Sequence, residues 1–228
     1  MVKLKNYYQI IKKLSKTIKV KLKISLKIMN SKIATIKDIY NLLSLELEKT
    51  DQLITQNSQS KYSPLTSQIS TNIIKSGGKK IRPILTILTT KIANLNHDLD
   101  DYLQLAAAVE LIHTATLLHD DVIDDSKMRR NSKTANYIWG NKASILVGDF
   151  LFSVAFKLMV QSGSIAALES LANCAKIITD GEIMQMQISN DINISLDNYL
   201  QIAQFKTASL FASACQVGAI ITKKEQKI

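Results

Sequence analysis

The chain has 228 residues, 46% of them hydrophobic, with only seven glycines and two prolines. This length suffices for one sizeable core, and the scarcity of turn formers favours a single helical domain over a β-rich protein. Ten lysines and no acid lie in residues 1–32, so the net charge of +10 belongs to that segment alone. The basic charge therefore indicates no nucleic-acid-binding face, and we expect no nucleic acid as a partner.

Residues 1–28 alternate lysine with isoleucine, leucine and valine. Such a segment suits an anionic membrane surface or an organelle-targeting presequence, although the lack of arginine and the few serines weaken the second interpretation. A plainer interpretation is an extension upstream of the real start, because Met29 opens a stretch of more ordinary composition. We favour this one. Residues 1–32 are then a basic N-terminal extension, residues 33–228 the folded domain, and membrane contact is at most peripheral.

Hydrophobic periodicity predicts a succession of helices and neither a hairpin nor a sustained strand. The first two helices are expected over residues 33–56 and, after a polar linker, Leu65–Lys75. The others are expected over Ile84–Ala93, Tyr102–Asp125, Asn136–Gly140 leading into Ile145–Gln161, Ile165–Asn190 and Leu196–Ile221. The runs LAAAV, LIHTATLL and ILVGDFLFSVAF are apolar nearly all round, so their helices should be central in a bundle.

Residues 77–83 read GGKKIRP, a glycine loop that leads into the start of a helix. Free backbone N–H groups at a helix N-terminus, with Lys79 and Arg82 beside them, suit an anion. A Gly-Gly helix stop followed by a basic start is also an ordinary feature, so this motif alone is a weak signal.

Residues 111–130 read LIHTATLLHDDVIDDSKMRR and place four aspartates within six residues, directly before two arginines. In a helix, Asp120 and Asp124 lie one turn apart on one face and repel unless a cation neutralises them. Mg²⁺, which takes one or two carboxylates together with phosphate oxygens, suits this pattern. The plain alternative is a solvated acidic helix end with surface arginines.

Arginine usage favours the functional interpretation. The chain has 26 lysines but only three arginines, and Arg82, Arg129 and Arg130 all stand beside the candidate phosphate sites. Guanidinium groups bind phosphate oxygens bidentately. His113 precedes Asp120 by two helical turns and therefore faces the same way. A lone histidine is more often a core residue than a ligand, but this face favours a functional role.

Cys174 and Cys215 are far apart, without CxxC spacing or a nearby histidine. Such cysteines are typical of reduced core thiols in a cytoplasm-like compartment. We see no signal-peptide cleavage pattern, and the longest clearly uncharged run, Thr207–Thr222, is shorter than a bilayer span. We expect a soluble, cytoplasmic protein, with an organelle matrix as the alternative location.

The motifs GGKKIRP, LIHTATLLHDDVIDDSKMRR, VGDFLF and QFKTASLF, in this order over roughly residues 33–220, resemble the trans-isoprenyl diphosphate synthases. The similarity is greatest to bacterial octaprenyl and decaprenyl diphosphate synthases of quinone biosynthesis. The resemblance implies an all-α, isoprenoid-synthase-like bundle around a deep central cavity, usually a homodimer. It also implies a long-chain prenyltransferase that adds isopentenyl diphosphate to an allylic diphosphate and yields an all-trans polyprenyl diphosphate.

The resemblance also implies roles for single residues. Asp120, Asp121 and Asp124 match the acidic motif that holds Mg²⁺ against the allylic diphosphate. Together with Lys206, they match the catalytic residues of the family. Ala115 and Thr116 match positions that set product length, and their small side chains leave room for a product of the C40 to C50 class.

Two further sets match the residues that bind the substrates. The isopentenyl diphosphate site corresponds to Lys79, Arg82, His113 and Arg130. The allylic diphosphate site corresponds to Arg129, Lys206 and Thr207.

The sequence departs from the family pattern at three points. Asn131 replaces the usual glycine after the arginines, and Gln185 stands where short-chain relatives carry an acid. The family's second aspartate-rich motif is missing before the chain stops at Ile228, so we expect the N-terminal two-thirds of such an enzyme, inactive alone. The alternative is a non-catalytic truncated remnant or a partner subunit. A terpene cyclase shares the DDxxD pattern but leaves GGKKIRP and His113 unexplained.

Overall fold

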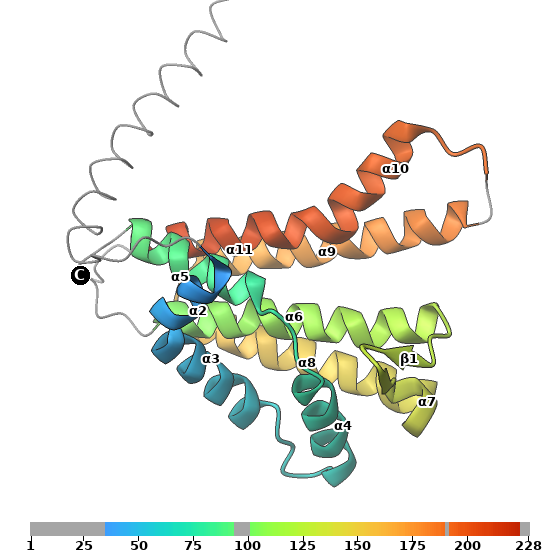
Figure 1. The fold of residues 1–228 in the computed structure, drawn as a ribbon, viewed down its shortest axis with the longest axis horizontal. Coiled ribbons are helices and arrows are strands. Elements are labelled where there is room, and N and C mark those ends of the chain that lie inside the picture. Colours follow the sequence, from blue (N-terminus) through green and yellow to red (C-terminus); the bar gives the residue numbers. More distant parts are fainter. Residues whose placement is uncertain (1–34, 94–100, 190–191, 224–228) are drawn as a thin grey trace, which may run out of the picture.

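The structure, a computed structural model, describes residues 35–93, 101–189 and 192–223. The extension expected at residues 1–32 lies outside these ranges. The described part is almost wholly helical, so the all-α prediction is confirmed (Figure 1). The elements are, in chain order, α2 (Ile36–Leu42), α3 (Ser44–Asn57), α4 (Pro64–Lys75), α5 (Ile81–Ala93), α6 (Asp101–Ile123), β1 (Met128–Arg129), β2 (Ser132–Lys133), α7 (Ala135–Trp139), α8 (Asn141–Gln161), α9 (Ile165–Ile188), α10 (Leu196–Ala203), the π-helix η1 (Gln204–Ala208), α11 (Ser209–Ile220) and the 3₁₀-helix η2 (Ile221–Lys223).

Several helices begin at side-chain caps. At α2, the Thr35 hydroxyl accepts from the backbone of Asp38, and the Asp38 carboxylate accepts from the backbone of Thr35. Ser63 caps α4, with Pro64 in the first helical position, and Ser164 caps α9. These caps satisfy N–H groups that have no partner within the helix, and therefore fix where each helix starts.

The sequence predicted one helix over residues 33–56, and this is wrong. The chain forms α2 and α3, with Leu43 between them in a non-helical conformation (φ −104°, ψ 16°). The Leu43 side chain is fully buried in a small core cluster with Ile84 and Ile87 of α5. We attribute the break to this burial, because anchoring Leu43 against α5 offsets the interruption of the helix.

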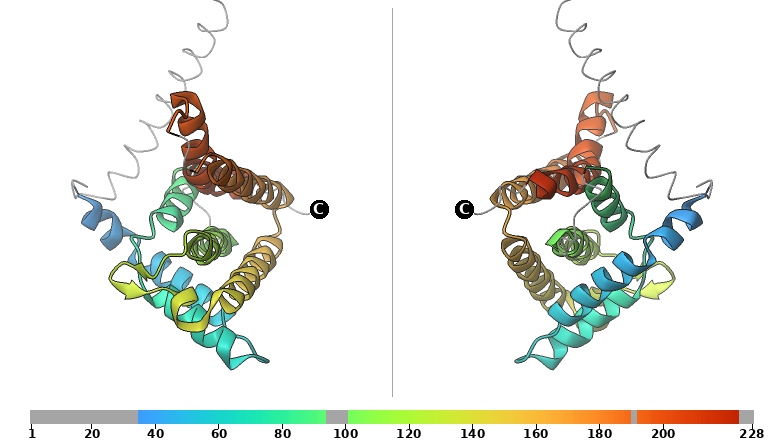
Figure 2. Two further views of the ribbon diagram at one scale, coloured as in Figure 1. Left: turned by 90° about the vertical axis from the view of Figure 1, so that its right-hand side faces the viewer. Right: turned by 90° about the vertical axis from the view of Figure 1, so that its left-hand side faces the viewer.

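Helix α6 forms the centre of the bundle, as predicted. Looking along the bundle, Figure 2 shows α6 with the other helices arranged around it. Residues 105–109 are all fully buried, and five successive buried residues cover every side of a helix. Its apolar surface is therefore covered on all sides, and α6 is the element against which the sites are assembled.

Helix α8, which was also expected to be central, has an exposed face. It runs beside α6 (Figure 1) and buries its inner face there. On its outer face, Leu146, Phe156 and Val160 are 67%, 43% and 64% exposed. Among the described helices, α8 alone has the length and apolar composition that a membrane span requires. Its packing against α6 accounts for the apolar character of the inner face.

A two-stranded hairpin follows α6, although the sequence predicted none. Met128 pairs with Lys133 and Arg129 with Ser132, which leaves Arg130 and Asn131 as the turn. Their φ angles are 49° and 64°. A two-residue hairpin turn with positive φ at both positions matches the twist of the strands, and asparagine tolerates this conformation well. Asn131 can thus replace glycine at this turn.

The last helical segment is interrupted where the sequence predicted one helix over Leu196–Ile221. The π-helix η1 lies between α10 and α11. Here α9 approaches so closely that a Cβ on Gly181 would lie 2.8 Å from the backbone nitrogen of Lys206. π-Helical turns of this kind often occur at functional sites.

Candidate active site

Four side chains from distant parts of the chain line one pocket of about 420 Å³. They come from the α4–α5 loop, the start of α5, the middle of α6 and the hairpin turn. They are the four residues predicted for the isopentenyl diphosphate site, Lys79, Arg82, His113 and Arg130. The structure therefore brings this predicted set together, and we call the space the cationic pocket.

The glycine loop packs tightly against the hairpin. A Cβ on Gly78 would lie 3.0 Å from a terminal nitrogen of Arg130, so any larger residue would push the guanidinium aside. Tyr40 donates a hydrogen bond to the carbonyl oxygen of Lys79, and the Lys80 ammonium pairs with Asp51. These contacts hold the loop while the Lys79 side chain remains exposed.

Arg82 stacks on an aromatic ring. Its guanidinium carbon lies 4.3 Å from the centre of the Phe211 ring on α11. Burial lowers the pKa of Arg82, and its Nε has no hydrogen-bond partner among the described residues. A partly buried guanidinium whose buried Nε donor is unused is suited to bind an anionic oxygen.

His113 is uncharged at neutral pH. Burial lowers its pKa to about 3, helped by the positive charges of Arg82, Arg130 and Arg129. The imidazole can thus donate one hydrogen bond to an anion without adding charge.

Glu110, which was not among the predicted site residues, also lines the cationic pocket. It lies on α6 one turn before His113. Burial raises its pKa, although Lys80, Arg82 and Arg130 favour the ionised form. The signal in the sequence is a single acid inside the otherwise apolar run AAAVELI.

The C-terminal end of α6 carries the acidic motif, with Asp120 and Asp124 one turn apart. Burial raises the pKa of Asp120 to about 6, and the negative charges of Glu182 and then Asp124 add to this effect. Such carboxylates favour a nearby cation, and hard divalent ions prefer oxygen ligands. No cluster of three or more metal-ligating side chains occurs among the described residues, so these two oxygen donors fit an ion that takes its other ligands from water and phosphate.

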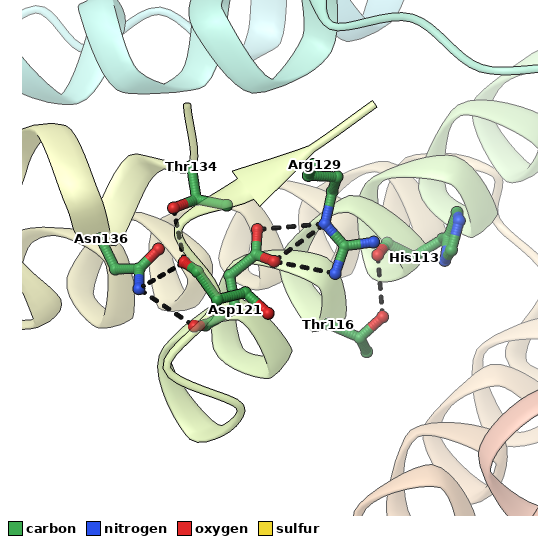
Figure 3. A network of polar contacts seen from close by, with 7 residues as sticks. His113, Thr116, Asp121, Arg129, Thr134 and Asn136 are labelled. Atoms are coloured by element: carbon green, nitrogen blue, oxygen red, sulfur yellow. Dashed lines mark hydrogen bonds and ion pairs between the residues drawn. The ribbon is translucent and has the colours of Figure 1, made fainter. Parts of the chain in front are cut away.

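Asp121, between these two residues in the sequence, is buried and bound to the hairpin. Its side chain is 1% exposed and binds Arg129 of the hairpin, with Nε 2.9 Å and 3.1 Å from the two carboxylate oxygens (Figure 3). Asn136 donates to the backbone oxygens of Asp121 and Ser126, and Thr134 donates to Ser126. Asp121, predicted as a metal ligand, thus has both oxygens engaged by Arg129.

Lys206 and Thr207, predicted for the allylic diphosphate, lie on η1. The Lys206 ammonium lies 2.8 Å from a carboxylate oxygen of Glu182 on α9, and Thr207 is exposed. The charges of Glu182 and Lys206 both act on Asp120, so the acidic motif lies within electrostatic range of this pair on α9 and η1. We call this group, Asp120, Asp124, Glu182 and Lys206, the acidic site. Glu182 was not among the predicted site residues.

The two residues predicted to set product length differ in burial. Thr116 is partly exposed one turn before Asp120, and its hydroxyl donates to the backbone oxygen of His113. Ala115 is fully buried in the main core cluster. Only Thr116 lies on the aspartate-bearing face.

The two cysteines are both free. Cys174 is buried as expected, whereas Cys215 is only half-buried.

A family model described as "Polyprenyl synthetase" matches residues 63–228. The chain belongs to the polyprenyl synthetase family. It is 37% identical over 196 residues to the octaprenyl diphosphate synthase of Escherichia coli strain K12, which covers 80% of this chain and 60% of that enzyme.

Solved structures of this family have the same fold. A polyprenyl synthase from Caulobacter crescentus CB15, complexed with calcium and isoprenyl diphosphate, gives a TM-score of 0.80 at 43% identity, over 84% of this chain and 58% of that one. A decaprenyl diphosphate synthase from Rhodobacter capsulatus also gives 0.80, at 38% identity, over 82% and 57%. The isoprenoid-synthase-like helical fold is confirmed. The chain spans about 60% of the length of these polyprenyl synthetases.

Proposed function

We propose that the protein acts as a long-chain trans-prenyltransferase of quinone biosynthesis, of the octaprenyl or decaprenyl class. It would add isopentenyl diphosphate to an allylic diphosphate with Mg²⁺ as cofactor. The observation that carries this proposal is the pairing of two different anion sites on one helix, since α6 contributes His113 to the cationic pocket and Asp120 to the acidic site. A reaction between two diphosphates needs two such sites, held at a fixed separation.

The cationic pocket supports binding of isopentenyl diphosphate without a metal. Lys79 is exposed, Arg82 has an unused donor, Arg130 lies against the glycine loop, and His113 is neutral. These groups supply forked and single donors to the phosphate oxygens. They would hold the diphosphate at one end and leave the double bond free to point along α6.

The acidic site supports binding of the allylic diphosphate as its metal complex. Asp120 and Asp124 would hold Mg²⁺, which when bound neutralises charge that develops on the departing pyrophosphate. Lys206 on η1 and Arg129 on the hairpin would bind oxygens of the same diphosphate. The carbon–oxygen bond of the allylic substrate breaks and pyrophosphate departs with the electron pair. The isopentenyl double bond then attacks the allylic carbon, which leaves a cation at C3 of the isopentenyl unit. Loss of a proton from C2 of that unit forms the new double bond. Donors fixed in advance by the fold lower the cost of this charge separation.

The exposed face of α8 supports a homodimer. Leu146, Phe156 and Val160 form an apolar stripe on a helix whose other side is buried against α6. Large exposed apolar stripes commonly mark protein–protein contacts, and a second copy of α8 is the simplest partner.

Calorimetric titration of the purified chain tests the proposed function. Isopentenyl diphosphate should bind in the presence of EDTA, and Arg82→Ala should abolish this binding. Farnesyl diphosphate should bind at the acidic site only when Mg²⁺ is added, and Asp120→Asn should weaken that binding while isopentenyl diphosphate still binds. If neither ligand binds, or if both variants weaken both ligands equally, the assignment of two separate sites is wrong.

A further inference from the structure

Glu182 occupies an unexpected position for an acid, next to a lysine expected to bind diphosphate. Gly181 allows α9 to approach η1 so closely that no side chain fits between them. The next residue, Glu182, therefore lies directly against Lys206, with 2.8 Å between carboxylate oxygen and ammonium. The two side chains are only 15% and 22% exposed, so this pair is largely shielded from water.

We propose that Glu182 makes the acidic site accept a metal-complexed diphosphate and reject a metal-free one. This inference rests on the proposed function, because it concerns the site assigned to the allylic substrate. Glu182 is a positioning residue in this role, since it acts by holding Lys206 and by its charge.

The charges around the site favour this discrimination. Glu182 lies against the Lys206 ammonium, and the negative charges of Glu182 and Asp124 both act on Asp120. A diphosphate without metal would have to displace Glu182 from Lys206 and then lie beside the remaining carboxylates. Like charges in a partly buried site repel strongly, so this binding is unfavourable.

A divalent cation reverses the balance. With a cation at Asp120 and Asp124, the same carboxylates stabilise the complex. One oxygen of Glu182, Oε1, is buried and has no hydrogen-bond partner in the described part of the chain. Mg²⁺ keeps several of its waters, and such a water would supply the missing donor to this oxygen. Glu182 therefore opposes the bare anion and favours its metal complex.

Titration with inorganic pyrophosphate tests this, in an Arg82→Ala background that disables the cationic pocket. Glu182→Gln keeps the shape and the acceptor for Lys206 but removes the charge. In EDTA this variant should bind pyrophosphate on the order of tenfold more tightly than the parent, because one opposing charge is gone. With Mg²⁺ it should bind about fivefold more weakly, because the acceptor for the metal-bound water is poorer. Opposite changes in affinity with and without Mg²⁺ would distinguish this role from a purely structural one.

Two further variants complete the test. Glu182→Asp keeps the charge and should keep the rejection of metal-free pyrophosphate. Glu169→Gln removes an exposed charge from the same helix and should change neither affinity. Weaker binding of Glu182→Gln in both conditions, or no change in either, would overturn the inference. If the parent binds no Mg²⁺–pyrophosphate while its circular dichroism and cooperative unfolding show a folded protein, the proposed function itself fails.

Discussion

The cationic pocket and the acidic site lie seven residues apart on α6, between His113 and Asp120, yet their charges are opposite. The first combines Lys79, Arg82 and Arg130 with one acid, Glu110, whereas the second combines three acids with one cation, Lys206, which pairs with Glu182. An anion can enter the first directly but needs a cation to enter the second. Under the proposed function, α6 would therefore contribute to two sites that recognise a diphosphate in different ways.

The largest expected effect concerns the scaffold of the acidic site. Asp121→Ala should leave the Arg129 guanidinium without its partner in a largely buried place. Removing one member of a buried ion pair costs about 3–5 kcal/mol of the free energy of unfolding, and we expect the lower end because Arg129 is 28% exposed. Chemical denaturation measures this. Asp180→Ala, at an exposed position on α9, is the control and should cost little. An equal loss in both variants would show that the pair has no special role.

Arg82→Lys tests the cationic pocket. Lysine has no planar fork and stacks less well on Phe211, so the affinity for isopentenyl diphosphate should fall by about 1–3 kcal/mol, with no effect on Mg²⁺-dependent binding of farnesyl diphosphate. Calorimetry of both ligands compares the two sites directly. Lys75→Ala removes an exposed cation and serves as the control. Unchanged affinity in Arg82→Lys would show that Arg82 contributes only a positive charge and that its planar guanidinium has no special role.

The contact between α6 and α8 holds the end of α6 that carries the aspartates of the acidic site. The His119 ring lies where a side chain at position 148 would be, since a Cβ on Gly148 would lie 2.2 Å from its Nε2. This nitrogen donates to the backbone oxygen of Ile145 and lies 3.5 Å from Asp149. Gly148→Ala should therefore cost about 1–3 kcal/mol of stability through overpacking.

A double mutant isolates this contact. In Gly148→Ala with His119→Ala the clash is absent, so the two losses should be less than additive. Additive losses in thermal unfolding would mean that the ring and the glycine do not interact.

The smallest expected effect is on pH dependence, which should differ between the sites. The pKa of Asp120 is about 6, above its usual value of 3.8, so its contribution to stability is greatest below pH 3.8 and is lost as the pH rises through 6. A bound cation favours the ionised form. Mg²⁺-dependent binding of farnesyl diphosphate should therefore strengthen up to roughly tenfold between about pH 5 and pH 7.

The cationic pocket supplies the contrast. The pKa of His113 is about 3, so its charge does not change over that range and should not alter binding of isopentenyl diphosphate. Calorimetry at several pH values measures the affinity for both ligands. Asp120→Asn should flatten the pH dependence of farnesyl diphosphate binding. A pH profile of the same shape for the two ligands would remove the distinction between the sites.

Much of this arrangement could be predicted from the sequence, because it depends on local spacing. The helical positions of His113, Asp120 and Asp124 follow from the period of an α-helix, and the apolar run of α6 indicates its central place. Arg130 could be assigned to the same site as Lys79 only through the family resemblance, since a turn with two positive φ angles brings it there.

The contributions of Glu110 and Glu182 could not be predicted by spacing. The role of Glu110 depends on cations from three other parts of the chain. The role of Glu182 depends on a π-helix, which a regular periodicity does not reveal. The break at Leu43 likewise depends on contacts with α5, which lies far along the chain. Tertiary contacts decide such features, whereas the hydrophobic pattern decides the helices.

Titration of Mg²⁺ alone is the most direct test of the central claim, that the acidic site binds a diphosphate only through a metal and the metal only with a diphosphate. Asp120 and Asp124 offer two carboxylates where Mg²⁺ takes six ligands, so water and phosphate must supply the rest. Calorimetry should detect no tight binding of Mg²⁺ to the protein by itself, and strong binding once a non-hydrolysable farnesyl diphosphate analogue is present. Tight Mg²⁺ binding without the analogue, unaffected by its addition, would contradict the account.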